Sequence, residues 1–97
     1  MKYKLSHKAE EDIINIFVEG TLQFGIDQAE RYHAELEKCF LFLADNPEVA
    51  RLRFELDPPV RMHPFVSHLI IYTVAADGDV FIIRVRHGHE DWLSNQI

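Results

Sequence analysis

The sequence predicts an α+β domain, in which a short N-terminal strand precedes an antiparallel helical hairpin packed on one face of a small antiparallel β-sheet. Apolar residues recur at helical spacing through the first half of the chain, and they alternate or run together in the second half. An Asp77-Gly78 pair between two apolar runs is typical of a tight hairpin turn. A chain of 97 residues can bury one modest core, so we expect a single domain over residues 1–97.

The N-terminal segment predicts a strand followed by a capped helix. Lys2–Leu5 alternates in polarity, as a short strand does. The Ser6 hydroxyl can cap the next helix, and three acidic residues near the first turn suit the positive end of the helix dipole. Apolar residues lie along one face of this helix, which we expect to continue to about Phe24 and to end at Gly25.

A second helix is predicted from Asp27 to Asp45. Asp27 followed by Glu30 forms a variant of the capping box, and an Asn-Pro pair at residues 46–47 ends the helix. Its apolar residues also share one face, which consists of Ala29, Tyr32, Leu36, Cys39, Phe40 and Leu43. Two helices joined at Gly25 form an antiparallel pair whose apolar faces need a sheet to cover them.

The rest of the chain predicts three strands. Residues 47–59 are expected to be irregular, because Asp57-Pro58-Pro59 cannot form regular ladder hydrogen bonds. Val60–His63 is a short predicted strand, and Pro64 restricts it to a sheet edge or a bend. A hairpin then extends from Val66 to His87, and its first strand is expected to reach Ala76.

A two-residue type I′ turn at Asp77-Gly78 would fix the pairing of the hairpin strands. On the face expected to be covered by the helices it opposes Val74 with Phe81, Tyr72 with Ile83, Ile70 with Val85, and His68 with His87. On the other face it opposes Ala75 with Val80, Thr73 with Ile82, Ile71 with Arg84, and Leu69 with Arg86.

This second face, called the outer sheet face below, is predicted to be a docking surface for a partner chain. The uncovered face of an antiparallel sheet is normally polar, yet Leu69, Ile71, Val80 and Ile82 are expected to be exposed there. The alternative is that Trp92 or the rest of the C-terminal tail folds over the face and covers it.

Charge and composition limit the function classes. The formal net charge is −6, with the acidity concentrated in the predicted helices. Arg84, Arg86, His87 and His89 form a local basic cluster, but the whole chain suits a nucleic-acid backbone poorly, so strong direct binding of nucleic acid is not expected. Cys39 is expected to be a small buried hydrophobic residue in a reducing compartment. No run is apolar enough to span a membrane, so we expect a cytoplasmic protein.

Several segments together resemble the ParE branch of the RelE/ParE toxin superfamily. Together they cover almost the whole chain. The first is the strand and helical hairpin that ends in Leu43-Ala44-Asp45-Asn46-Pro47. The others, in chain order, are Arg51-Leu52-Arg53-Phe54-Glu55-Leu56, Val60-Arg61, Ile70-Ile71-Tyr72, and Ile82-Ile83-Arg84-Val85-Arg86-His87-Gly88 with Asp91. The resemblance implies a RelE/ParE-like fold and a toxin of a bacterial type II toxin–antitoxin module, inhibited by its antitoxin. It implies inhibition of DNA gyrase for ParE-like members and cleavage of mRNA on the ribosome for RelE-like members.

We therefore predict a toxin that inhibits gyrase by binding, without chemistry of its own. Residues expected to contact the target are Arg61, His63, His87, His89 and Trp92. Family members often have an arginine where this chain has His89, which weakens any contact that needs a permanent planar cation. Residues expected to contact the antitoxin are Leu69, Ile71, Ile82, Arg84 and Arg86. No cofactor is expected, and residues 87–91 lack the ligand spacing of a structural zinc site.

Two other function classes stay open. A ribosome-dependent, metal-independent ribonuclease would need a base, an acid and a cation beside the scissile phosphate. Candidates for these roles are Arg61, His68, Arg86, His87 and His89. His68 and His87 could instead only close the open end of the core. The third class is a non-toxic interaction module.

Overall fold

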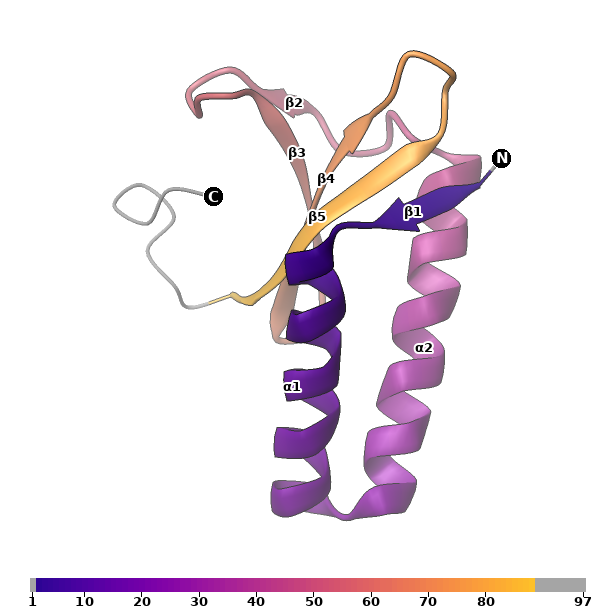
Figure 1. Ribbon diagram of the computed structural model, residues 1–97, viewed down its shortest axis with the longest axis vertical. Coiled ribbons are helices and arrows are strands. Elements are labelled where there is room, and N and C mark those ends of the chain that lie inside the picture. Colours follow the sequence, from indigo (N-terminus) through magenta and orange to yellow (C-terminus); the bar gives the residue numbers. More distant parts are fainter. Residues whose placement is uncertain (1, 89–97) are drawn as a thin grey trace.

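The computed structural model describes residues 2–88 and contains two helices and five strands (Figure 1). Their order is β1 (Tyr3–Leu5), α1 (His7–Phe24), α2 (Ile26–Asp45), β2 (Leu52–Arg53), β3 (Val60–Phe65), β4 (His68–Val74) and β5 (Val80–His87). The strands form one sheet in the order β1-β5-β4-β3-β2. The α+β class is confirmed, with one difference: β1 lies parallel to β5, whereas all other neighbouring strands are antiparallel.

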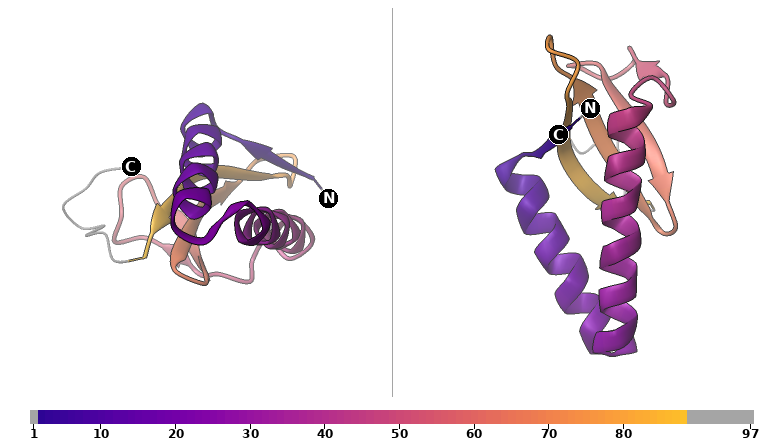
Figure 2. Two further views of the ribbon diagram at one scale, coloured as in Figure 1. Left: turned by 90° about the horizontal axis from the view of Figure 1, so that it is seen from below. Right: turned by 90° about the vertical axis from the view of Figure 1, so that its right-hand side faces the viewer.

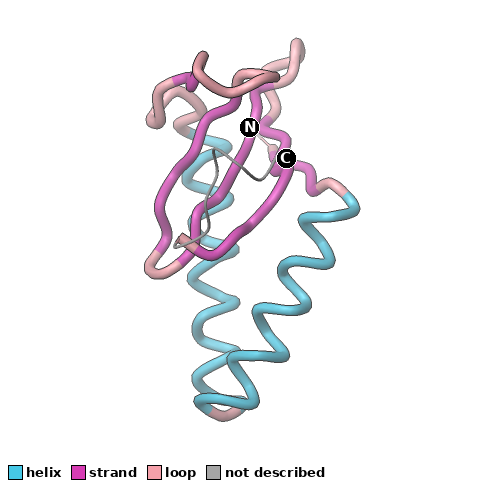
Figure 3. The backbone as a smooth tube through the Cα atoms, turned by 90° about the vertical axis from the view of Figure 1, so that its left-hand side faces the viewer, coloured by secondary structure: helices cyan, strands magenta, loops and turns pink. Residues whose placement is uncertain are grey.

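The helical hairpin covers one face of the sheet. Figure 2 shows the two helices meeting at one end and separating toward the sheet. The end of the hairpin at Gly25 extends beyond the strands (Figures 1 and 3). None of the helices within residues 2–88 has the length and apolar character needed to cross a lipid bilayer.

The helix ends differ in how well their caps were predicted. Ser6 caps α1 as expected, since its Oγ accepts from the Ala9 backbone N–H at 2.9 Å. The same hydroxyl donates to the Ile83 carbonyl at 2.6 Å, which ties the helix start to β5. The predicted Asp27 cap is wrong, because α2 begins at Ile26 and Gly25 caps it without a side chain. Gly25 can link the helices alone because its φ of 90° suits glycine.

The core lies between the helices and the central strands. Its buried residues are Ala9, Ile13, Leu36, Phe40, Leu43, Ile70, Tyr72, Val80, Ile82 and Val85. Tyr72 carries the only hydroxyl in this cluster and donates it to the Pro47 carbonyl at 2.9 Å, so burying it leaves no unpaired donor. Ile70, Tyr72 and Val85 were all predicted for this face.

The β4–β5 turn differs from the predicted type I′ turn. The Ala75 N–H donates to the Asp79 carbonyl at 2.8 Å and the Gly78 N–H to the Ala75 carbonyl at 2.9 Å, so the loop has three residues, 76–78. Near the turn, Val74 therefore pairs with Val80 and Tyr72 with Ile82. A β-bulge between the Tyr72 and Ile71 pairs adds one residue to β5, and beyond it the predicted pairing holds from Ile71–Arg84 to His68–His87.

This shift moves residues between the two faces. Val80 and Ile82 were predicted to be exposed on the outer sheet face, but both are fully buried in the core. Phe81 was predicted for the core and is 39% exposed instead. A one-residue change of register exchanges the faces of a strand, which explains all three corrections.

The other strands also differ from their predicted limits, since β2 and β3 extend beyond them and β4 is shorter than predicted. β2 lies inside the segment expected to be irregular, and it pairs only with Val60 and Arg61 of β3. β3 continues through Pro64 to Phe65, which is possible because β2 does not pair with that part of β3. β4 begins at His68, since Val66 and Ser67 form the turn that joins it to β3.

Candidate functional site

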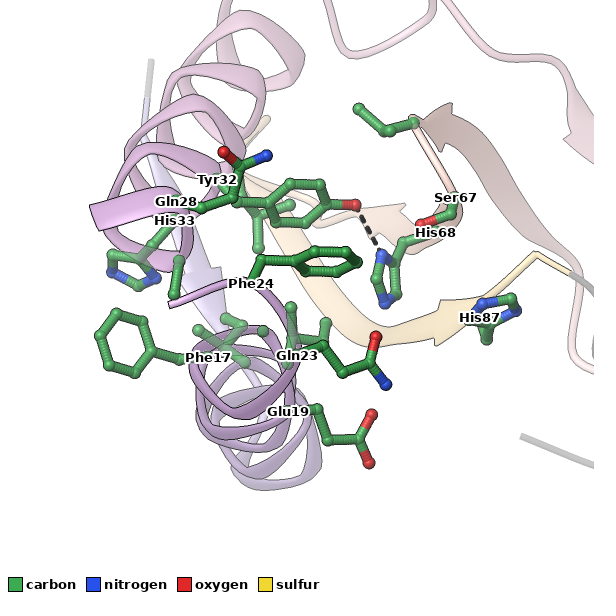
Figure 4. A pocket seen from close by; sticks show the side chains of 16 residues that line it. Phe17, Glu19, Gln23, Phe24, Gln28, Tyr32, His33, Ser67, His68 and His87 are labelled. Atoms are coloured by element: carbon green, nitrogen blue, oxygen red, sulfur yellow. Dashed lines mark hydrogen bonds between the residues drawn. The ribbon is translucent and has the colours of Figure 1, made fainter. Parts of the chain in front are cut away.

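A cleft of about 480 Å³ lies between the two helices and the turn that joins β3 to β4 (Figure 4). Its apolar lining comes mainly from α1 and α2, and its polar groups come from both helices, from the β3–β4 turn and from the strand ends. The lining includes Phe17, Glu19, Gln23, Phe24, Gln28, Tyr32, His33, Val66, Ser67, His68 and His87. The cleft therefore combines an apolar body with a few convergent polar groups, as binding sites commonly do.

Tyr32, His68 and His87 form the polar cluster of the cleft. The Tyr32 hydroxyl and His68 Nδ1 are 2.7 Å apart and share a hydrogen bond, drawn as the dashed line in Figure 4. The rings of His68 and His87 meet edge-on with centroids 5.5 Å apart. Tyr32 comes from α2, His68 from β4 and His87 from β5, so the fold assembles the cluster from three elements. The predicted pairing of His68 with His87 is confirmed.

The β3–β4 turn forms one rim of the cleft and holds a strained residue. Val66 has φ +52°, a conformation that a β-branched residue rarely adopts, and its side chain is 81% exposed. The Gly88 N–H donates to the Ser67 carbonyl at 2.8 Å. A Cβ on Gly88 would lie only 3.2 Å from that carbonyl oxygen, so glycine permits the close approach that fixes the turn.

The predicted target-contact residues do not form one surface. Arg61 donates to the Ala50 carbonyl, and His63 lies against α2, with Nδ1 3.8 Å from Cys39 Sγ and its ring near Phe42. His87 lies instead in the cleft, two strands away. His89 and Trp92 are outside the described residues. Burial raises the pKa of the Cys39 thiol, so this cysteine is a poor nucleophile at neutral pH.

The outer sheet face differs from the exposed apolar surface that was predicted. Ile82 lies in the core, Ile71 is fully buried, and Leu69 is half-buried. Arg84 is only 17% exposed, because its Nε donates to Asp12 of α1 at 2.8 Å and its Nη2 donates to the same carboxylate at 3.1 Å. The apolar exposure expected of this face is therefore wrong, although Ile71 does lie opposite Arg84 as predicted.

Sequence reasoning missed several cleft residues. Tyr32 was assigned only to the apolar face of the second helix, and neither Phe24 nor Val66 was assigned to a site. A tyrosine within an apolar helical face could have indicated a buried polar contact, since its hydroxyl needs a partner. The exposure of Phe24 and the strain at Val66 had no sequence signal. No group of three or more His, Cys, Asp or Glu side chains able to hold a metal ion occurs within residues 2–88.

Comparison with known proteins gives a consistent set of relatives. A family described as the ParE toxin of type II toxin–antitoxin system, parDE, matches residues 3–92. Two proteins named Toxin ParE1 are similar: that of Mycobacterium tuberculosis H37Rv is 32% identical over 93% of this chain and 92% of its own length, and that of Caulobacter vibrioides is 31% identical over 88% and 86%. The structure titled "Chromosomal ParDE TA system from P. aeruginosa" superposes with a TM-score of 0.75 at 19% identity, over 90% of this chain and 95% of that one.

Proposed function

The chain belongs to the ParE toxin family of type II toxin–antitoxin systems, and from this premise we propose that it inhibits DNA gyrase by binding it. We further propose that a cognate antitoxin neutralises it in the cytoplasm. The ribonuclease alternative requires a base, an acid and a cation beside the scissile phosphate, whereas inhibition by binding requires only a contact surface.

The observation that carries the binding proposal is that two arginines are bound to groups of the fold itself. RNA cleavage needs a cation free to stabilise the charge that develops on the phosphate. The Arg84 guanidinium is bound to Asp12, and the Arg61 guanidinium is bound to the Ala50 carbonyl. These two cations therefore hold the fold together. Neither of them, nor Arg86, is among the described residues that line the cleft with His68 and His87.

The cleft is the contact surface that best suits a protein target. Its apolar walls suit an aliphatic or aromatic side chain, and the Tyr32–His68–His87 cluster lines it with polar groups. Phe24 and Val66 are 68% and 81% exposed, and both line the cleft. We propose that His87, Val66 and Phe24 contact gyrase. Arg61 and His63 have a structural role instead, since they contact Ala50 and α2.

The antitoxin contact is proposed on the exposed part of the outer sheet face. Leu69 lies opposite Arg86 there. Both residues are half-buried, so they offer mixed apolar and cationic area to a partner chain. Ile71 is fully buried and the Arg84 guanidinium is bound to Asp12, so these two add little to the exposed area. Ile82 is excluded from this proposal because it lies in the core.

Inhibition of purified gyrase tests the proposed function. We expect the chain to block DNA supercoiling and to leave ribosome-bound mRNA intact. Val66→Asp and His87→Ala should each weaken inhibition about tenfold, the loss of roughly 1.4 kcal/mol of binding energy. His7→Ala is the matched control, because His7 lies at the start of α1 with a side chain 91% exposed.

Two other outcomes would change the assignment. Site-specific transcript cleavage that is lost in His87→Ala would establish the ribonuclease and reject the binding mechanism. Expression of the chain without an antitoxin should stop growth. Unchanged growth, with the protein present and folded, would favour the non-toxic interaction module.

A further inference from the structure

α1 presents a second apolar face that no described residue covers. Ile14, Val18 and Leu22 are 61%, 49% and 81% exposed. Residues four apart lie on the same side of a helix, so these three side chains form a row about 12 Å long, called the α1 stripe here. Ala9 and Ile13, which face the core, are buried at 0% and 9% exposure. α1 is thus apolar on the side that packs in the fold and on a side that does not.

Acidic residues accompany the α1 stripe. Glu11 and Glu19 are exposed on the same helix, and neither has an ion pair within the described part of the chain. The last turn of α1 contains no basic residue to balance the negative end of the helix dipole. Asp27, in the first turn of α2, adds another carboxylate beside that end. The stripe therefore lies in a negative electrostatic environment.

We propose that the α1 stripe binds an amphipathic helix of a partner protein, with apolar residues at four-residue spacing and lysine or arginine at its flanks. Rows of side chains at four-residue spacing on two helices can interdigitate, which gives a crossing angle of about −50°. The basic flanks would pair with Glu11 and Glu19. A second copy of this chain fits poorly, because its own stripe carries the same negative charge. The proposal does not depend on which target the toxin inhibits.

The position of α1 in the fold leaves room for a partner helix. α1 runs along one side of the molecule, and its end at Gly25 projects beyond the sheet (Figures 1 and 2). A partner helix could approach this end without moving a strand. The cleft opens between α1, α2 and the β3–β4 turn, and none of the three stripe residues lines it, although Glu19 borders both surfaces.

Titration of the isotope-labelled full chain with defined peptides tests the proposal. The probe is an amidated 18-residue helix of leucine, alanine and lysine, with leucines on one face and lysines at the flanks. We expect backbone NMR shifts to map to residues 14–22. A peptide of scrambled order and one with glutamate in place of lysine should each bind at least about tenfold more weakly.

Variants of the chain separate the two contributions. Leu22→Asp should weaken binding of the lysine peptide about tenfold, whereas Leu41→Asp, the same change at a 54% exposed leucine of α2, should leave it unchanged. Glu11→Lys with Glu19→Lys should weaken binding and remove most of its salt dependence. Equal binding of the three peptides, or shifts that map away from α1, would overturn the proposal. So would shifts of residues 14–22 on dilution without peptide, since these would identify a second copy as the occupant.

Discussion

At the residue scale, Asp12 joins a helix to a sheet edge. Its carboxylate accepts from the Arg84 Nε and Nη2 groups and also from the Val85 backbone N–H at 3.0 Å. β1 pairs with β5 only as far as Ile82, so Asp12 provides a partner for the β5 edge where the β1 ladder has ended. One carboxylate thus neutralises a half-buried guanidinium and satisfies an edge donor.

Asp12→Ala should therefore destabilise the fold strongly. It removes the acceptor that Asp12 provides to Arg84 and to the Val85 N–H, which should lower the free energy of unfolding by about 2 to 3 kcal/mol. Urea denaturation followed by circular dichroism measures the change. Glu11→Ala, on the exposed side of the same helix, is the control and should change stability by less than about 0.5 kcal/mol. Equal effects of the two substitutions would show that the Asp12–Arg84 pair contributes little.

Tyr72→Phe tests the buried hydroxyl group. Loss of its hydrogen bond to the Pro47 carbonyl should lower the free energy of unfolding by about 1 kcal/mol at pH 7. Burial raises the pKa of Tyr72, so the folded chain holds this proton more tightly than the unfolded chain does. The stabilisation is complete below the unfolded pKa of about 10 and is lost as the pH rises through the folded pKa.

Urea denaturation between pH 8 and 11 provides the measurement. Wild type should lose stability above about pH 10, and Tyr72→Phe should lose less. Some alkaline dependence should persist in the variant, because burial also raises the pKa of Tyr3. Identical pH profiles for the two proteins would contradict the role assigned to the Tyr72 hydroxyl.

At the element scale, the β3–β4 turn combines strain with exposure. Asparagine adopts positive φ more readily than valine, so Val66→Asn should raise the free energy of unfolding by about 1 kcal/mol. The same change should weaken gyrase inhibition, because it removes an apolar side chain from the rim of the cleft. Thermal unfolding and the supercoiling assay measure the two effects. Val49→Asn, at a half-exposed valine whose φ is not positive, should leave both nearly unchanged. A destabilised Val66→Asn would show that the turn is not strained.

The hairpin shows which features of an element a sequence can predict. Both strands and the turn region were predicted because alternation and Asp-Gly are local signals. The loop length was not, since glycine at positive φ suits a two-residue turn and also the three-residue turn found here, in which Gly78 has φ 91°. The bulge in β5 depends on distant partners, because Ser6 binds the carbonyls of both Ile82 and Ile83. No local signal in residues 66–87 contains that information.

Part of the candidate site could likewise be predicted from local signals, and part of it could not. His68 and His87 were paired correctly because the bulge restores the predicted register before it reaches them. Arg61 and His63 were assigned to the same surface as His87, as one rim between the linker and the C-terminal tail. In the structure, Arg61 pairs across the sheet with Tyr72, which is four strand positions, or about 13 Å, from the His68–His87 level. Tyr32 and Phe24 reach the cleft because of the way the helices cross the sheet. The apolar pattern of the sequence alone does not determine that crossing.

At the scale of the whole molecule, charge and shape separate its surfaces. The helical hairpin extends beyond the sheet (Figure 1) and carries most of the acidic residues, whereas Arg61 belongs to β3 and Arg84 and Arg86 belong to β5. Arg61 and Arg84 are bound to groups of the fold itself. The net field of the chain, at −6, therefore repels a polyanion as it approaches.

Weak RNA binding is the corresponding prediction. Non-specific affinity for nucleic acid comes mainly from phosphate contacts that release counterions, and non-specific binders typically have a Kd of about 10⁻⁴ to 10⁻⁶ M. Because the hairpin is acidic and two arginines are engaged in the fold, we expect a Kd weaker than about 10⁻⁴ M for a fluorescent 20-nucleotide RNA at about 0.15 M salt. Fluorescence anisotropy measures it, with a basic RNA-binding domain as the positive control. A low-micromolar Kd that weakens steeply with added salt would instead require a phosphate-binding surface and would favour the ribonuclease over the gyrase inhibitor.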